Sequence, residues 1–420
     1  MATATKSVVE VCREAKEASH QLARAGREAK DACLRDLADR IDANVAPLLE
    51  ANRADVEAGR ERGLDEALID RLTLTEARIA EMAKGIREIA DLDDPVGEVV
   101  EGWTLENGLE VAKKRAPMGV VAVVYEARPN VTIDAAALCL KSGNAAVLRG
   151  SSSAETSNAF LAGLIAEALA AAELPAASAS LLSGGHEQLE ELATQEGLVD
   201  LIIPRGGEGL KEALKRVATV PVMYAAAGNC HVYVHQDADL GMAENVAYNA
   251  KVQRPGVCNA AETLLVHSDV AGELLPSLLA KLSGAGVELV GDERTRDAAG
   301  TVPVGEAGEA DWDTEYHGLK MAVGVVDSLS EAIEHINRHG TGHSDAILTS
   351  SQEVGDEFTD AVDSAAVYVN ASTRFTDGYE FGMGAEIGNS TQKLHARGPI
   401  GLRELTTTKY VVHGSGQIRE

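Results

Sequence analysis

The sequence predicts an α/β protein with parallel sheets, for three reasons. From residue 119 onward, short apolar runs alternate with amphipathic stretches, a pattern typical of parallel strands joined by helices. Apolar residues make up 45% of the 420 residues, which suffices for at least one full core and excludes a mainly disordered chain. No apolar run reaches the roughly 18 residues that a membrane-spanning helix requires, so none is expected.

The first ninety residues predict helices, and a hairpin separates them from the alternating region. Apolar residues at helical spacing, such as Val8, Val11, Cys12 and Ala15, indicate one buried face. Residues 96–111 predict a hairpin that turns at Glu106-Asn107-Gly108. Further helices are predicted at 155–172, 187–194 and 240–252, and strands at 120–125, 145–148, 179–182, 201–203, 220–224, 231–235, 263–267, 287–290, 322–326, 345–348 and 366–370.

The charge balance is strongly acidic, with a formal net charge of −28. Phosphates would be repelled at long range, so neither a nucleic acid nor an anionic membrane is an expected partner. A solvated acidic surface suits high salt, because salt screens the repulsion among like charges. We therefore expect a salt-adapted acidic protein.

The N-terminus and the cysteines indicate a cytoplasmic protein. Residues 1–16 carry charges at helical intervals and contain no apolar h-region, so a secretory signal is not expected. The cysteines are odd in number and widely spread, with no metal-ligand or redox spacing, so we expect reduced thiols and no metal site. They are Cys12, Cys33, Cys139, Cys230 and Cys258.

Cys258 is the cysteine with the strongest claim to chemistry. It lies in a tight connection between a predicted helix and a predicted strand, after the breakers Pro255 and Gly256. The cations Lys251 and Arg254 nearby would favour the reactive thiolate. The alternative is a small buried apolar side chain, as expected for the other cysteines. Cys230, at the start of a predicted strand, is the only serious rival.

Polar residues follow several predicted strands where a ligand can be bound. Asn130 follows the strand at 120–125 and either donates its amide into a cleft or caps the next helix. Arg149 and Ser151 end the strand at 145–148, a place that suits a ribose phosphate. Two glycine turns, at 183–186 and 204–209, let phosphates approach backbone N–H groups, although such turns are common without a ligand. The glycine-rich stretch at 381–388, continuing to 402, reads as a solvated loop by composition alone.

Four segments, taken together, closely resemble the gamma-glutamyl phosphate reductases, a family within the aldehyde dehydrogenase superfamily. The resemblance covers nearly the whole chain in the same order. It implies an NADP-dependent oxidoreductase that reduces L-glutamyl 5-phosphate to L-glutamate 5-semialdehyde and phosphate through a cysteine thioacyl intermediate. This reaction is the second step of proline biosynthesis from glutamate. The segments are Val124-Tyr125-Glu126-Ala127-Arg128-Pro129-Asn130-Val131-Thr132, Ile202-Ile203-Pro204-Arg205-Gly206-Gly207, Arg254-Pro255-Gly256-Val257-Cys258-Asn259-Ala260 and Lys393-Leu394-His395-Ala396-Arg397-Gly398-Pro399.

The resemblance also implies roles for individual residues. Cys258 matches the catalytic nucleophile, and Asn130 matches the amide that stabilises the oxyanion. Cations for the substrate are expected from the motif segments, with Arg374 the preferred contact beside Arg128, Arg254 and Arg397. NADPH or NADP is the implied cofactor, and its expected ligands are Arg149 and Ser151 at the adenosine ribose, Gly206 and Gly207 at the diphosphate, and Glu315 at the nicotinamide ribose.

The implied organisation is interleaved. An NADP-binding domain is expected from 1–97 and 115–230, a catalytic domain from 231–402, and an oligomerisation flap from 98–114 and 403–420. Trp103 and Tyr410 would then take part in subunit contact within a homo-oligomer. A functional link to glutamate 5-kinase follows from the substrate.

The absence of one acidic residue distinguishes the expected reductase from a hydrolytic aldehyde dehydrogenase. Hydrolytic aldehyde dehydrogenases place a glutamate about 35 residues before the cysteine to activate water. Here that region reads Tyr224-Ala225-Ala226-Ala227-Gly228-Asn229, although the reductases often carry an acid near Ala227. The absence argues against a hydrolytic aldehyde dehydrogenase. Intact Cys258, Asn130 and Glu315 argue against the other rival, a scaffold without turnover.

Overall fold

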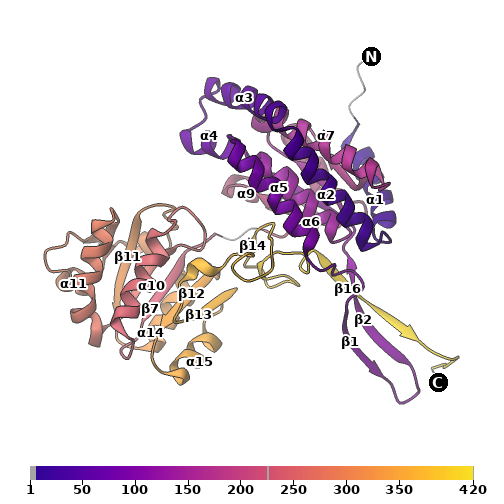
Figure 1. Ribbon diagram of the computed structural model, residues 1–420. Coiled ribbons are helices and arrows are strands. Elements are labelled where there is room, and N and C mark those ends of the chain that lie inside the picture. The colour runs from indigo at the N-terminus through magenta and orange to yellow at the C-terminus, as the bar shows by residue number, and fades with distance from the viewer. Residues whose placement is uncertain (1–5, 225–226, 420) are drawn as a thin grey trace. The chain divides into compact units, whose positions relative to one another are not determined.

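The computed structural model describes residues 6–224 and 227–419, and the chain forms two compact units (Figure 1). Unit 1 consists of Met1–Ala225, Gly382–Gly388 and Ile400–Glu420. Unit 2 consists of Ala226–Phe381 and Asn389–Pro399. Segments far apart in the sequence thus belong to the same unit, and unit 1 includes two segments, 382–388 and 400–402, from the range expected for the catalytic domain. Among the described residues, no helix is long and apolar enough to cross a membrane.

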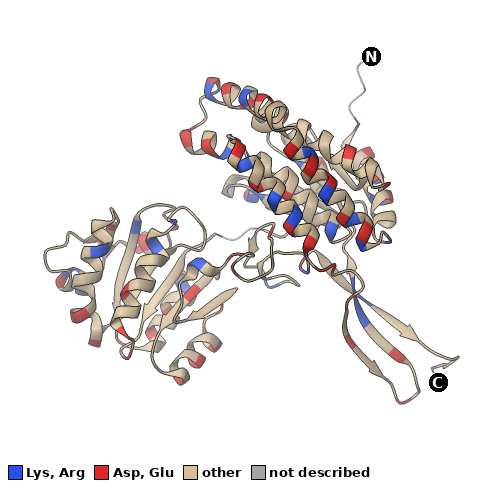
Figure 2. Cartoon of the chain, viewed as in Figure 1, with Lys and Arg blue, Asp and Glu red and all other residues tan. Residues whose placement is uncertain are grey.

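Acidic side chains are spread over the helices of both units (Figure 2). Several form ion pairs at the surface, such as Arg87 with Asp39 and Asp42, each at 2.7 Å. Exposed pairs of this kind contribute little to stability. The acidic helices therefore present a charged, hydrated surface.

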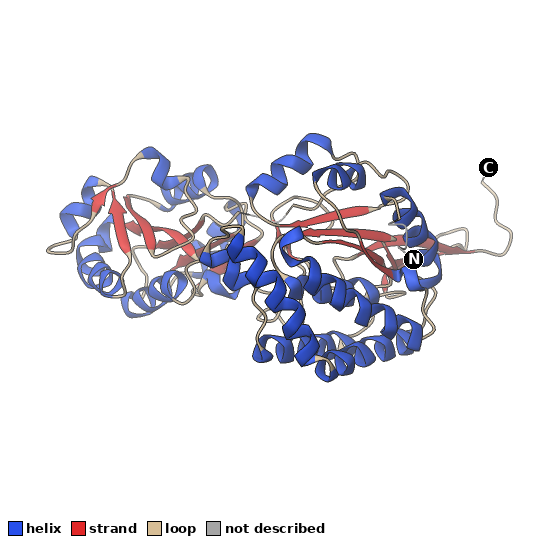
Figure 3. Cartoon of the chain, turned by 90° about the horizontal axis from the view of Figure 1, so that it is seen from above, coloured by secondary structure: helices blue, strands red, loops and turns tan. Residues whose placement is uncertain are grey.

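Unit 1 contains a four-stranded parallel sheet in the order β5-β4-β3-β6. Helices lie on both faces of this sheet (Figure 3). The face that packs on α1, α8 and α9 buries Val120, Ala122 and Val124 of β3 completely. The elements are α1 (Val8–Leu22), α2 (Arg27–Ala43), α3 (Val45–Glu61), α4 (Glu66–Leu72), α5 (Glu76–Asp91), β3 (Val120–Tyr125), α6 (Pro129–Lys141), β4 (Ala145–Arg149), α7 (Glu155–Ala171), β5 (Ala179–Leu181), α8 (His186–Ala193), β6 (Leu201–Arg205) and α9 (Glu208–Val217).

A separate antiparallel sheet, in the order β1-β2-β16, joins the predicted hairpin to the C-terminal strand. Its strands are β1 (Val99–Thr104), β2 (Glu110–Pro117) and β16 (Thr406–His413). The hairpin turns where the sequence predicts, because Gly108 adopts a φ of +83°. Trp103 and Tyr410 make an edge-to-face contact with ring centroids 6.3 Å apart, yet their residues remain 43% and 62% exposed. Together with exposed Val99, Val100 and Val412, they give this sheet an apolar surface.

Unit 2 contains a seven-stranded sheet in the order β10-β9-β11-β8-β7-β12-β13, with parallel neighbours throughout. Its central strands are buried on both faces, as their continuous apolar runs predict. The elements are β7 (Cys230–Val234), α10 (Leu240–Val252), β8 (Ala261–His267), α11 (Ser268–Gly284), β9 (Glu288–Gly291), α12 (Glu293–Ala298), β10 (Gly305–Glu306), α13 (Glu309–Trp312), β11 (Lys320–Val326), α14 (Leu329–His339), β12 (Ser344–Leu348), α15 (Gln352–Ala361), β13 (Ala366–Val369), β14 (Asn389–Ser390) and β15 (Gly398–Pro399).

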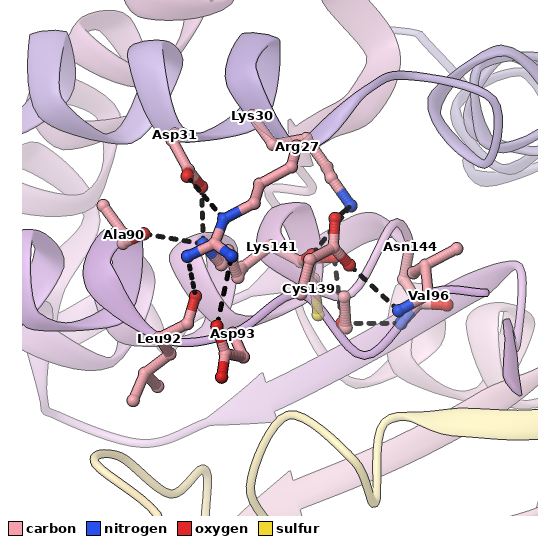
Figure 4. A network of polar contacts seen from close by, with 12 residues as sticks. Arg27, Lys30, Asp31, Ala90, Leu92, Asp93, Val96, Cys139, Lys141 and Asn144 are labelled. Carbon is pink, nitrogen blue, oxygen red and sulfur yellow. Dashed lines mark hydrogen bonds and ion pairs between the residues drawn. The ribbon is translucent and has the colours of Figure 1, made fainter. Parts of the chain in front are cut away.

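A buried polar network joins α2, α5 and α6 to the segment that enters the hairpin (Figure 4). Lys141 donates to Asp31 at 2.5 Å and to the carbonyl of Ala90 at 2.6 Å. Lys30 donates to the Lys141 carbonyl at 3.1 Å and pairs with Asp94 at 2.5 Å. Burial lowers the pKa of Lys141, because the charged ammonium is shielded from water. Each charge in the network therefore depends on its partner.

The strand predicted at 220–224 is wrong. Only Val222 makes a ladder contact, an isolated parallel bridge to Ile202. Within the described residues, pairing with β6 is limited to two hydrogen bonds, from the Ile202 N–H to the Pro221 carbonyl and from the Met223 N–H to the Ile202 carbonyl, each at 2.9 Å. Val220 and Met223 are buried against the core. The α/β class and the other predicted strands are confirmed, with bounds that differ by a few residues at most.

The first prediction concerns His343 in unit 2. Its imidazole is buried beside Ser344, at 2.7 Å from the hydroxyl, and burial lowers its pKa from 6.5 to about 4. The unfolded chain then binds more protons between these values, so this residue should lower stability as pH falls from 6.5 to 4, by up to about 3 kcal/mol. Urea unfolding across this range should show a shallower loss for His343→Gln than for the parent chain. Parallel pH profiles for the two chains would contradict the assignment.

Candidate active site

Cys258 lies in the connection between α10 and β8, at the amino end of a buried parallel strand. It is half-buried, whereas the other four cysteines are buried. Burial raises the pKa of Cys12 to about 11 and those of Cys33 and Cys139 to about 12, and it raises the pKa of Cys230 well above its ordinary value. Those four thiols therefore stay protonated, and Cys258 is the cysteine with solvent access.

The main chain at Gly228 packs directly against Cys258. A Cβ atom added at Gly228 would lie 1.5 Å from the Cys258 carbonyl oxygen and 2.6 Å from its Cα. Only glycine permits this approach, because every other residue would overlap the backbone of the cysteine. Asn229 holds the segment in place, since its amide donates to the carbonyls of Trp312 at 2.6 Å and His339 at 2.8 Å.

Cys230, the first residue of β7, contacts the same loop. Its Sγ atom donates to the Cys258 carbonyl at 3.2 Å, and its residue is fully buried. This thiol therefore contacts the backbone of the loop and not solvent. The geometry gives Cys230 a structural contact and leaves Cys258 as the candidate nucleophile.

Two arginines lie near Cys258 in unit 2. Arg374 follows β13, and its Nε atom donates to Oε1 of the Gln253 side chain at 2.9 Å. Its guanidinium group also donates to the side chain of Asn259. Burial lowers the pKa of Arg374, and the charge of Arg254 lowers it further, while Cys258 opposes both. Arg254 itself is exposed. The predicted residues Arg254, Cys258 and Arg374 thus come together.

Glu315 lies in the loop between α13 and β11. Its side chain is 13% exposed, and its Oε2 atom lies 3.3 Å from Nε2 of His317. Its other oxygen, Oε1, is buried and has no hydrogen-bond partner in the described structure. A buried carboxylate oxygen of this kind requires a donor, and a ligand hydroxyl can supply one.

The predicted residues of unit 1 gather at one edge of its sheet. Parallel pairing sets Val124 opposite Arg149 and Tyr125 opposite Arg205. The segments that follow these three strands carry Asn130, Ser151 and the glycines at 206 and 207. They therefore start from the same carboxyl edge, where α/β sheets bind ligands.

Asn130 is not the helix cap that the sequence left open as an alternative. Helix α6 begins at Pro129 with Arg128 as its N-cap, so Asn130 lies inside the first turn. Its amide donates to Asp134 one turn later, at 3.0 Å. Burial raises the pKa of Asp134 to about 6, and Arg205 opposes the shift. This contact orients the Asn130 amide.

Arg149 and the glycine turn of α9 both have partners within the chain. The Arg149 Nη2 atom donates to the carbonyls of Gly184 at 3.2 Å and Gly185 at 2.7 Å, while its Nε atom is buried without a partner in the described structure. The Gly207 N–H donates to Glu126 at 3.0 Å. The backbone N–H at the start of α9 therefore already donates to a carboxylate oxygen. The amino end of a helix favours anions of this kind.

Close packing also explains two of the small residues at this edge. A Cβ atom at Gly206 would lie 2.7 Å from Cδ of Glu126, so the turn has no space for a side chain. The Ser151 hydroxyl lies 2.5 Å from that of Ser153. Both residues keep the segments after β4 and β6 compact.

Sequence reasoning missed two acids that contact predicted site residues, Glu126 and Asp134, and a third, Glu262, that contacts the loop of Glu315 at His317. Asp134 follows Asn130 by four residues, a spacing that brings side chains together on a helix, so a signal was present. Glu126 and Glu262 contact main-chain N–H groups far along the chain, at Gly207 and His317. No local pattern reveals contacts of that kind.

Comparison with known proteins decides the family. The model of the aldehyde dehydrogenase family matches residues 1–302. The chain belongs to the aldehyde dehydrogenase family. Within this family, it is 52% identical over 415 residues to a gamma-glutamyl phosphate reductase of Thermobifida fusca strain YX, covering 99% of each chain.

Solved aldehyde dehydrogenase structures agree with the observed fold. The crystal structure of gamma-glutamyl phosphate reductase from Thermotoga maritima matches with a TM-score of 0.96 and 47% identity, covering 99% of this chain and 100% of that one. An acetylating aldehyde dehydrogenase from Geobacillus thermoglucosidasius matches with a TM-score of 0.69 at 19% identity, over 98% and 97% of the two chains. At that identity the second match shows the fold alone. The family and fold class inferred from the sequence motifs are confirmed.

The close approach at Gly228 generates a prediction. Gly228→Ala should destabilise the chain by at least about 3 kcal/mol, because the new methyl group meets rigid backbone. Gly272, in the exposed face of α11, has no atom within 4 Å of an added Cβ, so Gly272→Ala should be neutral or stabilising. Urea unfolding of both variants tests the difference. Equal stability would contradict the packing described at Cys258.

Proposed function

We propose that the chain is a gamma-glutamyl phosphate reductase, which converts L-glutamyl 5-phosphate to L-glutamate 5-semialdehyde and phosphate. The observation that carries this proposal is the half-buried Cys258, held on a loop beside a partly buried arginine. A thiol in that position can form a thioester, and a cation beside it favours both the thiolate and an anionic substrate. Relatives about half identical over the full length bear this name.

The chemistry assigned to the chain centres on Cys258. Its thiolate attacks the γ-carbonyl carbon of the acyl phosphate, and a tetrahedral oxyanion forms. We assign stabilisation of the oxyanion to the Asn130 amide and the Cys258 N–H. The C–O bond to phosphate then breaks, and the acyl group remains on sulfur as a thioester. A bound nicotinamide cofactor supplies hydride to this reaction.

The substrate carries a phosphate and a free α-carboxylate, so it requires cations within an acidic protein. Arg374 is our first choice, because backbone carbonyls of its loop accept hydrogen bonds from the side chain of Asn259, the residue that follows Cys258. Arg254 and Arg128 are proposed as further contacts. Their guanidinium groups offer paired donors that fit carboxylate and phosphate oxygens.

The residues fit a nicotinamide cofactor with a 2′-phosphate. The unpartnered Oε1 of Glu315 suits a ribose hydroxyl, and the buried Nε of Arg149 suits an anion. We therefore propose NADP as the cofactor, with Arg149 and Ser151 at its 2′-phosphate. Gly206 and Gly207 are assigned to the diphosphate, where Glu126 is the group that must share or yield the Gly207 N–H.

Phosphate, and not water, is the proposed acceptor of the acyl group in the reverse direction. Ala227, Gly228 and Asn229 place no acid beside Cys258, and residues 225 and 226 of the same segment, both alanines, lie outside the described residues. No side chain of this segment can therefore act as the base that hydrolysis requires.

The units and the small sheet receive roles on the same basis. We assign cofactor binding to 1–97 and 115–230, catalysis to 231–402, and assembly of a homo-oligomer to 98–114 and 403–420. The exposed apolar residues of the β1-β2-β16 sheet support the last assignment, because an apolar patch in solvent favours association. The cytoplasm is the proposed location, glutamate 5-kinase the proposed source of substrate, and high salt the condition that the net charge of −28 suits.

Oxidation of glutamate 5-semialdehyde by NADP tests the proposed function directly. With phosphate present, absorbance of NADPH should rise steadily at high salt. Without phosphate, the reaction should stop after one equivalent per active site, because the thioester has no acceptor. Steady turnover without phosphate would instead indicate a hydrolytic aldehyde dehydrogenase.

The two cysteines of the site give a matched pair of variants. Cys258→Ser should lose about three decades or more of turnover while keeping its fold, since a serine alkoxide does not form at neutral pH. Cys230→Ser should retain most activity, because its contact is to a backbone carbonyl. Activity and thermal unfolding measured together check both. The opposite ranking would move the nucleophile to Cys230.

Arg149 should determine the choice between the two nicotinamide cofactors. A charge-assisted contact to the 2′-phosphate is worth about 1.5–3 kcal/mol, or roughly 10- to 100-fold in affinity. Arg149→Ala should raise the KM for NADPH by this factor and leave the KM for NADH nearly unchanged. Arg53→Ala, at an exposed ion pair with Glu50, serves as the control. An equal change for both cofactors would place Arg149 away from the 2′-phosphate.

A further inference from the structure

A second ion pair, buried in unit 2, spans the loop that carries Cys258. Lys251 lies near the end of α10, before the loop, and Glu262 is the second residue of β8, after it. The two side chains are in contact and are 0% and 1% exposed. Burial lowers the pKa of Lys251 and raises that of Glu262 to about 7. Such a pair is costly to bury, so its presence calls for a role.

The same glutamate reaches the loop that carries Glu315. Its Oε1 atom accepts a hydrogen bond from the main-chain N–H of His317 at 3.4 Å, while Oε2 contacts Lys251. The Lys251 ammonium also lies 5.9 Å from the centre of the Tyr316 ring. Gly256 approaches from the cysteine loop, since an added Cβ would lie 3.6 Å from the His317 carbonyl. The two loops are therefore in contact, and the buried pair binds both.

The backbone of the second loop needs this restraint. His317 has a φ of +54°, a conformation that is uncommon outside glycine and is kept when surrounding contacts enforce it. The conformation brings the imidazole of His317 to 3.3 Å from Oε2 of Glu315. One carboxylate oxygen is thereby engaged, and the other, Oε1, is left buried without a partner in the described structure.

We propose that Lys251, Glu262 and His317 are positioning residues for Glu315: they hold its carboxylate so that Oε1 accepts a hydroxyl of the cofactor ribose. The proposal rests on the cofactor role proposed above for Glu315. It also explains why an ion pair, and not an apolar pair, lies at this place. Glu262 uses one oxygen for Lys251 and the other for the loop, which a leucine cannot do.

Two double variants separate positioning from simple burial. Lys251→Met with Glu262→Leu removes both charges and the acceptor, and apolar replacement of a whole buried pair is often tolerated. Lys251→Met with Glu262→Gln removes both charges but keeps an oxygen for the His317 N–H. Titration of NADPH by protein fluorescence should show at least about tenfold weaker binding for the first variant, the scale expected for a displaced ligating group. The second variant should bind within a few-fold of the parent chain.

A control pair from the same helix is available. Glu244 of α10 pairs with Lys281 of α11 at 2.9 Å, and both are partly exposed. Lys281→Met with Glu244→Leu should leave the dissociation constant of NADPH unchanged. Equal weakening by this pair would mean that the effect comes from general loosening of unit 2.

The decisive test combines these changes with Glu315→Ala. If the three residues act through it, then in Glu315→Ala the Lys251→Met and Glu262→Leu changes should weaken NADPH no further. Should the double variant fail to fold, His317→Ala gives the same test, because that side chain is 60% exposed and its loss removes the contact to Oε2.

The outcomes distinguish the cofactor role of Glu315 from the positioning role of the residues around it. Unchanged NADPH binding in Glu315→Ala would remove the cofactor role of Glu315, and the positioning role with it. Weaker binding in Glu315→Ala, but unchanged binding in His317→Ala and in the folded Met/Leu variant, would overturn the positioning role alone. Losses that add fully in the Glu315→Ala background would overturn it as well.

Discussion

The contact between Gly228 and the backbone of Cys258 is the constraint on which the candidate site depends. The main chain of one segment passes so close to the cysteine that no side chain fits between them. Cys230, two residues later, reaches the same carbonyl from β7. The cysteine loop is thus supported along its backbone, which leaves the Cys258 side chain as the part that meets solvent.

The two units use opposite edges of their parallel sheets. In unit 1, the residues assigned to the cofactor follow the carboxyl ends of β3, β4 and β6, which is the usual place for ligands in an α/β sheet. In unit 2, Cys258 precedes β8, and the loop of Glu315 precedes β11, a parallel neighbour of β8. The chemistry of unit 2 therefore lies at the amino edge. At this amino edge, contacts such as the Lys251–Glu262 pair hold the loops in place. Short loops have the same effect at the carboxyl edge in unit 1.

The sequence predicts elements well where burial is continuous. Strands β3, β7, β8 and β12 are buried along their whole length, and their apolar runs show this directly. The segment 220–224 has a similar composition, but it pairs with β6 only at the bridge between Val222 and Ile202 and does not continue as a strand. Helix α6 begins at Pro129, which takes the first position of the helix, where its missing N–H costs nothing.

The site was less predictable than the fold, for a physical reason. Cys258, Arg254 and Arg374 were identified from motifs, and the structure brings them together. Glu126 and Glu262, in contrast, act on backbone N–H groups at Gly207 and His317. A backbone donor leaves no trace in the sequence, so the carboxylate that binds it has no recognisable partner. Such contacts become visible only when the chain is folded.

The most direct test of the central claim is to find the acyl group on the protein. The purified chain is incubated with glutamate 5-semialdehyde and NADP without phosphate, quenched in acid, digested and examined by mass spectrometry. The account predicts one glutamyl group on the peptide that contains Cys258, and its loss when phosphate is added before the quench. A glutamyl group on the peptide of Cys230, or no modified peptide during active turnover, would contradict the account.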